Sequence, residues 1–196
     1  MIKKNVLVIM FLLCVSIVAA QKPVQVLNFN NGEYLISTNP LGTFKTGGLY
    51  VCSVGLSCIA DSLNSTNHYL YVYGRVELKG ELAVTLKNGF TMTLTPSFST
   101  HDRSRLGLIK KVDIYSTFYA ISESELRFMC EVGIAEMKIR RGDTWLTKIW
   151  EKDDMTCWLK SSYELITKRI AKLRETNHIN KLKSTSGMIA FASHLI

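Results

Sequence analysis

His101 and Asp102 form an adjacent histidine–carboxylate pair, the combination that can orient an imidazole as a general base. They fall in a polar stretch, residues 97–105, for which we expect a loop. The sequence contains no Gly-x-Ser-x-Gly motif to present a nucleophile on a sharp turn. We therefore interpret the pair as a surface hydrogen bond and assign no catalytic residue.

Paired carboxylates are the other chemistry to consider, because a glycoside hydrolase needs two of them at a set separation. The best-placed acids are Glu77, Glu81, Glu123 and Glu125. Each has a simpler task on a strand face or a helix cap. An envelope- or polysaccharide-directed hydrolase is therefore an alternative function, and it requires such groups to converge in one cleft.

Three tyrosines alternate along one apolar stretch, at Tyr69, Tyr71 and Tyr73. Side chains two positions apart in a strand share a face, so we expect a ladder of three rings. Such a ladder suits ligand binding, because tyrosine offers both a ring and a hydroxyl group. The competing interpretation is that the three rings cover the rim of a core.

Four cysteines lie beyond residue 20: Cys52, Cys58, Cys130 and Cys157. They permit three disulfide pairings, and spacing does not choose among them. We favour Cys52–Cys58, closed around a compact loop, while Cys130 and Cys157 would meet if two predicted helices pack together. The alternative is four buried thiols. No CxxC pair or histidine pair has ligand spacing, so we expect no metal and no cofactor.

The first twenty residues have the layout of a secretory signal peptide. Lys3 and Lys4 precede an apolar run, residues 6–18, and the small residues Ala19 and Ala20 follow. A membrane anchor is the competing interpretation, but a run of about 15 residues is short of the ~20 that a bilayer requires. We expect cleavage after Ala20, export to the periplasm or cell surface, and no transmembrane helix afterwards.

The chain carries a net charge of +8, which falls to about +6 without Lys3 and Lys4. Positive charge on an exported protein permits contact with anionic surfaces, although it also serves solubility alone. No nucleic-acid-binding motif is present, and we expect no nucleic-acid partner. The expected partner is an unidentified protein or a glycan.

Strands dominate the region from Val24 to about Trp150, where short β-branched and aromatic runs recur between turn residues. The best-specified hairpin covers residues 82–95. A three-residue loop over 87–89 pairs Leu82 with Leu94 and places the apolar side chains of both strands on one face. A second hairpin, residues 134–150, has Arg141-Gly142-Asp143 at its tip, which we interpret as turn chemistry.

Two helices are predicted late in the chain. Ser122 and Glu125 form a capping box for a short helix near 123–132. A long amphipathic helix near 155–183 carries an apolar stripe with basic residues on its other faces. We expect the stripe to pack on the sheet; the alternative is a helix lying on an anionic membrane surface. Residues 184–196 form a tail that is either an edge strand or a loose end.

Residues 82–166 resemble a group of small secreted proteins of unknown function from Bacteroidetes. Three features carry the resemblance: the Thr-rich strand after Asn88-Gly89, the stretch 119–126 leading into the short helix, and the strand 133–140. A basic helix follows in the same order. The resemblance implies a compact β-rich domain with late helices, and it transfers no activity or site residue.

These observations predict an exported, single-domain α+β protein over residues 21–183, built mainly from antiparallel sheet or a sandwich. We expect a non-enzymatic protein that binds a partner or ligand. The alternatives are the hydrolase and the membrane-surface protein described above.

Overall fold

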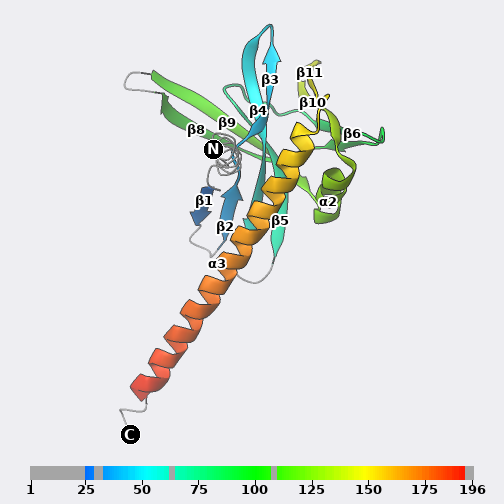
Figure 1. Ribbon diagram of the computed structural model, residues 1–196. Coiled ribbons are helices and arrows are strands. Elements are labelled where there is room, and N and C mark those ends of the chain that lie inside the picture. Colours follow the sequence, from blue (N-terminus) through cyan, green and yellow to red (C-terminus); the bar gives the residue numbers. More distant parts are fainter. Residues whose placement is uncertain (1–24, 29–32, 62–64, 107–109, 193–196) are drawn as a thin grey trace, which may run out of the picture.

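The computed structural model describes residues 25–28, 33–61, 65–106 and 110–192. Within them it is a mostly antiparallel α+β structure with two sheets, one short helix and one long helix (Figure 1). The predicted fold class is confirmed. The signal-peptide prediction falls on residues that lie outside the described part of the chain.

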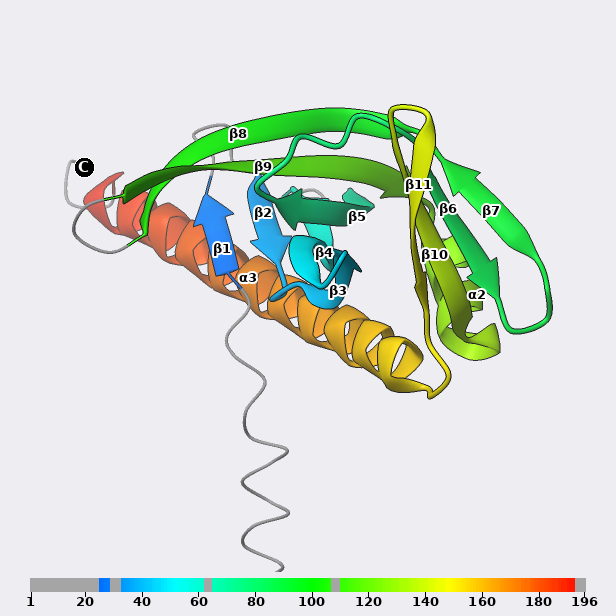
Figure 2. The same ribbon diagram turned by 90° about the horizontal axis from the view of Figure 1, so that it is seen from above.

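The larger sheet, sheet A, holds seven strands in the order β1-β2-β4-β5-β9-β8, and β3 pairs with β4 beside β2. Its strands are β1 (Gln25–Asn28), β2 (Tyr34–Ser37), β3 (Leu41–Thr46), β4 (Leu49–Ala60), β5 (Thr66–Gly74), β8 (Pro96–Leu106) and β9 (Lys110–Ile121). The sheet curls, so that β8 and β9 arch away from the long helix α3 (Asp154–Ala192), as Figure 2 shows.

The smaller sheet, sheet B, has the order β11-β10-β6-β7. Its strands are β6 (Leu82–Leu86), β7 (Thr91–Leu94), β10 (Ile134–Arg141) and β11 (Thr144–Ile149). The pairing of Leu82 with Leu94 is as predicted, and Gly89 has φ +85° in the loop between them. The turn interpretation of Gly142 also holds, because this residue joins β10 to β11 with φ +58°.

The short helix α2 (Glu123–Val132) begins and ends where the sequence predicts. The Ser122 side chain accepts a hydrogen bond from the Glu125 backbone N–H, and the Glu125 carboxylate accepts one from the Ser122 backbone N–H. Gly133 follows with φ +91°. These bonds pair backbone groups that the first turn would otherwise leave open.

The long helix α3 crosses sheet A and packs its predicted stripe against it (Figures 1 and 2). Leu159, Ile166 and Ile170 are buried, and Tyr163 and Leu173 are half-buried. The helix runs on to Ala192, through most of the tail for which an edge strand or a loose end was expected. No helix among the described residues is long and apolar enough to cross a membrane.

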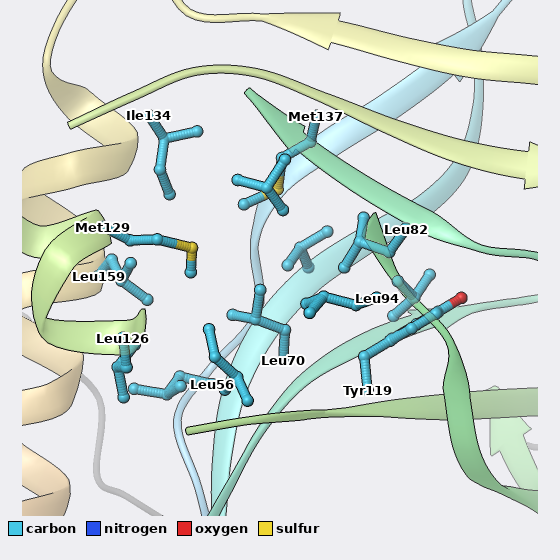
Figure 3. Packing of buried hydrophobic residues seen from close by; sticks show 14 of the residues in the cluster. Leu56, Leu70, Leu82, Leu94, Tyr119, Leu126, Met129, Ile134, Met137 and Leu159 are labelled. Carbon is cyan, nitrogen blue, oxygen red and sulfur yellow. The ribbon is translucent and has the colours of Figure 1, made fainter. Parts of the chain in front are cut away.

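The core lies between the two sheets and the two helices (Figure 3). Leu56 and Leu70 of sheet A meet Leu82 and Leu94 of sheet B, while α2 contributes Leu126 and Met129. The central strand β4 is buried on both faces from Val51 to Cys58. The face of β4 that points away from this core is therefore covered by other side chains as well.

Two local predictions were wrong. Residues 97–105 belong to strand β8 rather than a loop, and β4 continues through the stretch expected to form a loop between Cys52 and Cys58. Residues 97–105 are extended because they pair with β9 in a long hairpin, and β4 is extended because it pairs with strands on both sides; local propensity reports neither pairing.

Candidate functional site

The tyrosine ladder lies on the face of sheet A opposite α3. Alternation along β5 points Leu70 into the core and Tyr69, Tyr71 and Tyr73 to the other side. The shared face of the three tyrosines is therefore as predicted. Their surroundings differ, however, and only two of them reach the same hollow.

An aromatic row crosses this face. Phe98 of β8, Phe118 of β9 and Tyr71 of β5 are direct cross-strand neighbours. The Phe98 and Phe118 ring centroids are 4.5 Å apart at 12°, and those of Phe118 and Tyr71 are 5.7 Å apart at 28°. Phe118 is thus stacked on both sides. Tyr69 packs edge-on against Phe98 and Phe118 and does not line the hollow.

Gly55 lets the row extend over β4. It is the cross-strand neighbour of Tyr71, and a Cβ there would come within 2.2 Å of the Tyr71 ring. The Tyr71 ring occupies this space, and its hydroxyl group donates to the Thr38 backbone oxygen at 2.5 Å. Burial raises the pKa of the Tyr71 hydroxyl group, so it stays protonated and keeps donating.

A row of hydroxyl-bearing residues, the hydroxyl row, runs beside the aromatic row at a distance of two residues on each of the three strands. It consists of Thr100, Ser116 and Tyr73, which are again direct cross-strand neighbours. Adjacent strands are about 4.8 Å apart, so the row presents a hydroxyl-bearing side chain at about that interval.

The two rows help to line a groove of about 480 Å³, which we call the aromatic groove. Tyr71, Tyr73, Ser116 and Phe118 line it from the centre of the sheet. Residues 38–40, which leave β2, line it from one side, and Thr100 and Asp102 of β8 line it from the arch. The groove thus joins segments that lie far apart in the sequence.

The groove has an unusual charge for this protein. The whole chain has 24 Lys and Arg residues. Among the described residues that line the groove there is no Lys, Arg or His, and the one carboxylate is Asp102. Its lining is otherwise aromatic, hydroxyl, amide and apolar. None of the described lining residues therefore offers a cation to an anionic ligand.

The predicted hydrolytic groups do not converge. His101 and Asp102 are consecutive residues of strand β8 and point to opposite faces. His101 stacks on Tyr115 at 4.8 Å and lies 3.0 Å from Asp113, on the face away from the aromatic groove. His101 thus has a carboxylate partner at the surface, but this partner is Asp113 and not the predicted Asp102.

The four glutamates also occupy separate places with other partners. Glu77 lies 3.1 Å from Lys79, and Glu81 lies 3.6 Å from Arg140. Glu123 pairs with Arg127, and Glu125 caps α2. No group of three or more metal-ligating side chains occurs among the described residues.

The four cysteines are free thiols. Cys52 and Cys58 lie six positions apart on the extended strand β4, which separates them by about 20 Å, and a disulfide requires Cα atoms within about 7 Å. The favoured pairing is therefore wrong. Cys130 and Cys157 lie on the contacting helices α2 and α3, half-buried and exposed respectively.

A second set of polar groups joins α2, α3 and β5. The Tyr163 hydroxyl group donates to Glu123 at 2.8 Å, Arg127 donates to the same carboxylate oxygen at 2.6 Å, and the buried His68 ring lies 5.8 Å from the Tyr163 ring. Burial lowers the pKa of His68, and the Tyr163 hydrogen bond is the main cause that lowers the pKa of Glu123.

A hollow of about 580 Å³ lies beside this cluster, between α2 and α3. Arg127 and Tyr163 line it but are already engaged by Glu123. Its remaining charged residues have both signs, so no ligand class is selected. The aromatic groove is the better candidate site.

Comparison with protein-family models, with curated proteins and with solved structures finds no match for this chain. By its own architecture the chain is an antiparallel α+β protein, and its curled sheet carries an aromatic groove on the face away from the long helix.

Proposed function

We propose that this chain is an exported, non-enzymatic protein of the periplasm or cell surface that binds a ligand in the aromatic groove. The observation that carries the proposal is the groove itself. About 480 Å³ of space is lined in equal parts by apolar residues, three of them aromatic, and by polar residues, so that a ligand would meet both apolar surface and hydrogen-bonding groups. The N-terminal sequence pattern, with its basic residues, apolar run and small residues before Gln21, supports export.

The two alternative functions have less support. A hydrolase needs converging acid and base groups, and His101 and Asp102 lie on opposite faces of β8. A membrane-surface helix needs an unpartnered apolar stripe, and the stripe of α3 is packed on sheet A. We therefore retain neither as a second candidate.

Blocking the groove tests the binding proposal. We would incubate the purified protein with a small-molecule extract of the source cells and medium, wash it, and analyse retained compounds by native mass spectrometry. Ser116→Trp places an indole in the groove, and Thr147→Trp places the same group on an exposed position of β11. Retention by the wild type and Thr147→Trp, with loss in Ser116→Trp, is the expected result.

Equal retention by all three proteins, or retention by none, would contradict binding at this groove. Circular dichroism and urea unfolding establish that each variant is folded. Export is tested separately, by mass spectrometry of the N-terminus of protein recovered from the native host. A chain that still begins at Met1 would refute the signal peptide.

A further inference from the structure

We infer that the ligand of the aromatic groove is an uncharged glycan, an inference that rests on the proposed function. The argument uses three features of the groove: its row of hydroxyl groups, its stacked rings and its charge.

The hydroxyl row favours a ligand with many hydroxyl groups of its own. Thr100, Ser116 and Tyr73 stand side by side on three adjacent strands, at intervals of about 4.8 Å. Each side-chain hydroxyl group both donates and accepts hydrogen bonds. Sugar hydroxyl groups have the same dual capacity and recur every few ångströms along a glycan. A glycan that lies across the three strands therefore meets a hydrogen-bonding side chain on each strand.

The aromatic row favours an uncharged ligand over an ammonium ion. A cation binds the face of an aromatic ring, but both faces of Phe118 are covered, by Phe98 at 4.5 Å and by Tyr71 at 5.7 Å, and Phe118 and Tyr71 are themselves buried, so the row offers little ring face to a ligand. Rings stacked along the row turn their edges toward the neighbouring hydroxyl row. Ring edges carry partial positive charge, which suits hydroxyl oxygens and repels a cation.

The charge of the groove disfavours an anion. A chain with 24 Lys and Arg residues places none of them among the described lining residues, where the carboxylate of Asp102 lies instead. A carboxylate accepts hydrogen bonds from sugar hydroxyl groups and repels an acidic sugar. The three features together select a neutral glycan of a size that about 480 Å³ accommodates, one or two sugar units.

Isothermal titration calorimetry with defined probes tests this. The neutral probes are gluco-, xylo-, manno- and galacto-oligosaccharides, the acidic probe is an oligogalacturonate, and the apolar probe is the uncharged alcohol 1-octanol. We expect at least one neutral series to bind and the acidic probe to bind at least tenfold more weakly. Thr147→Trp should keep the affinity of the wild type, and Ser116→Trp should lose at least tenfold.

Conservative variants remove hydroxyl groups without filling the groove. Thr100→Val, Ser116→Ala and Tyr73→Phe should each weaken the neutral glycan by about three- to tenfold, the range of one hydrogen bond. Asp102→Asn should narrow the preference for the neutral over the acidic oligosaccharide by about threefold or more. These variants keep the test valid if Ser116→Trp fails to fold.

The outcomes separate this inference from the proposed function. Tighter binding of the acidic or apolar probe than of every neutral sugar overturns the glycan assignment, as does the absence of binding by every neutral series at about 10 mM sugar. In either case, an extract compound whose retention Ser116→Trp abolishes leaves the ligand-binding function standing. If neither the sugars nor the extract yields a groove ligand, both proposals fail.

Discussion

The Tyr71 hydroxyl group donates a hydrogen bond to the backbone oxygen of Thr38 at 2.5 Å, between residues 33 positions apart in the chain. The Tyr71 ring lies in the space that the missing Cβ of Gly55 leaves open. This contact ties the segment that leaves β2 to the centre of sheet A, so the shape of the aromatic groove depends on it.

Tyr71→Phe should lower the free energy of unfolding by about 1–2 kcal/mol, because the buried Thr38 oxygen loses its hydroxyl partner while the ring keeps its packing. Urea unfolding measures this. The matched control is Tyr50→Phe, which removes an exposed 3.1 Å bond to the Tyr73 oxygen and should cost about 0.5 kcal/mol or less, because water replaces the lost group. Equal losses in the two variants would contradict the structural role of Tyr71.

Gly55→Ala should destabilise the protein by about 1–3 kcal/mol, since the added methyl group overlaps the Tyr71 ring. The double variant Gly55→Ala/Tyr71→Val should lose less than the sum of the two single variants, by about 0.5–3 kcal/mol, because the clash disappears with the ring. Urea unfolding of all four proteins gives this coupling. Strict additivity would mean that the two residues do not meet.

The buried His68 should make stability depend on pH. Its pKa is lowered from 6.5 chiefly by burial, and the nearby Glu123 charge opposes this. Above about pH 6.5 the ring is neutral in both states. Below that, the unfolded chain binds a proton that the folded site resists, so the free energy of unfolding falls as the pH drops.

Replacing His68 by Phe should therefore flatten the loss of stability between about pH 6.5 and 5, measured by urea unfolding at several pH values. Glu123 and Glu125 act in a separate window: hydrogen bonds from Tyr163 and Ser122, respectively, lower their pKa values from 4.5, so their stabilisation is lost only at lower pH. An unchanged slope in His68→Phe would refute the assignment.

Ser122→Ala should lower the free energy of unfolding by about 1 kcal/mol, because it removes the side chain that caps α2. Ser122→Asp should retain most of the stability, since its carboxylate can accept the same backbone hydrogen bond. Thermal unfolding followed by circular dichroism makes the comparison. If the alanine variant were as stable as the aspartate variant, the cap would contribute nothing.

The thiols should differ in reactivity toward Ellman's reagent. Burial raises the pKa values of Cys52 and Cys58 to about 12, while Cys157 is exposed. In the folded protein Cys157 should react first, and Cys52 and Cys58 only after unfolding. Cys157→Ser should remove the fast phase. A fast phase that appears only after reduction would instead place Cys157 in a disulfide.

The elements whose interactions are local could be predicted from the order of the residues alone. The capping box of Ser122 and Glu125 involves residues three apart, the hairpin of Leu82 and Leu94 is specified by its own turn, and the stripe of α3 repeats with the helical period. The shared face of Tyr69, Tyr71 and Tyr73 follows in the same way from alternation along one strand.

The neighbours of the three tyrosines on that face could not be predicted, because they come from other strands. Phe98 and Phe118 reach Tyr71 through pairings between β5, β9 and β8, and Thr38 reaches it across β4, where Gly55 leaves room for the ring. The polar composition of residues 97–105 predicted a loop, but these residues form strand β8, paired with β9. The short spacing of Cys52 and Cys58 predicted a loop between them, but both lie on the extended strand β4. A strand is held by its pairing along its whole length, whether with the next strand, as in β8 and β9, or with one far along the chain, as in β5 and β9, and neither local propensity nor residue spacing carries that information.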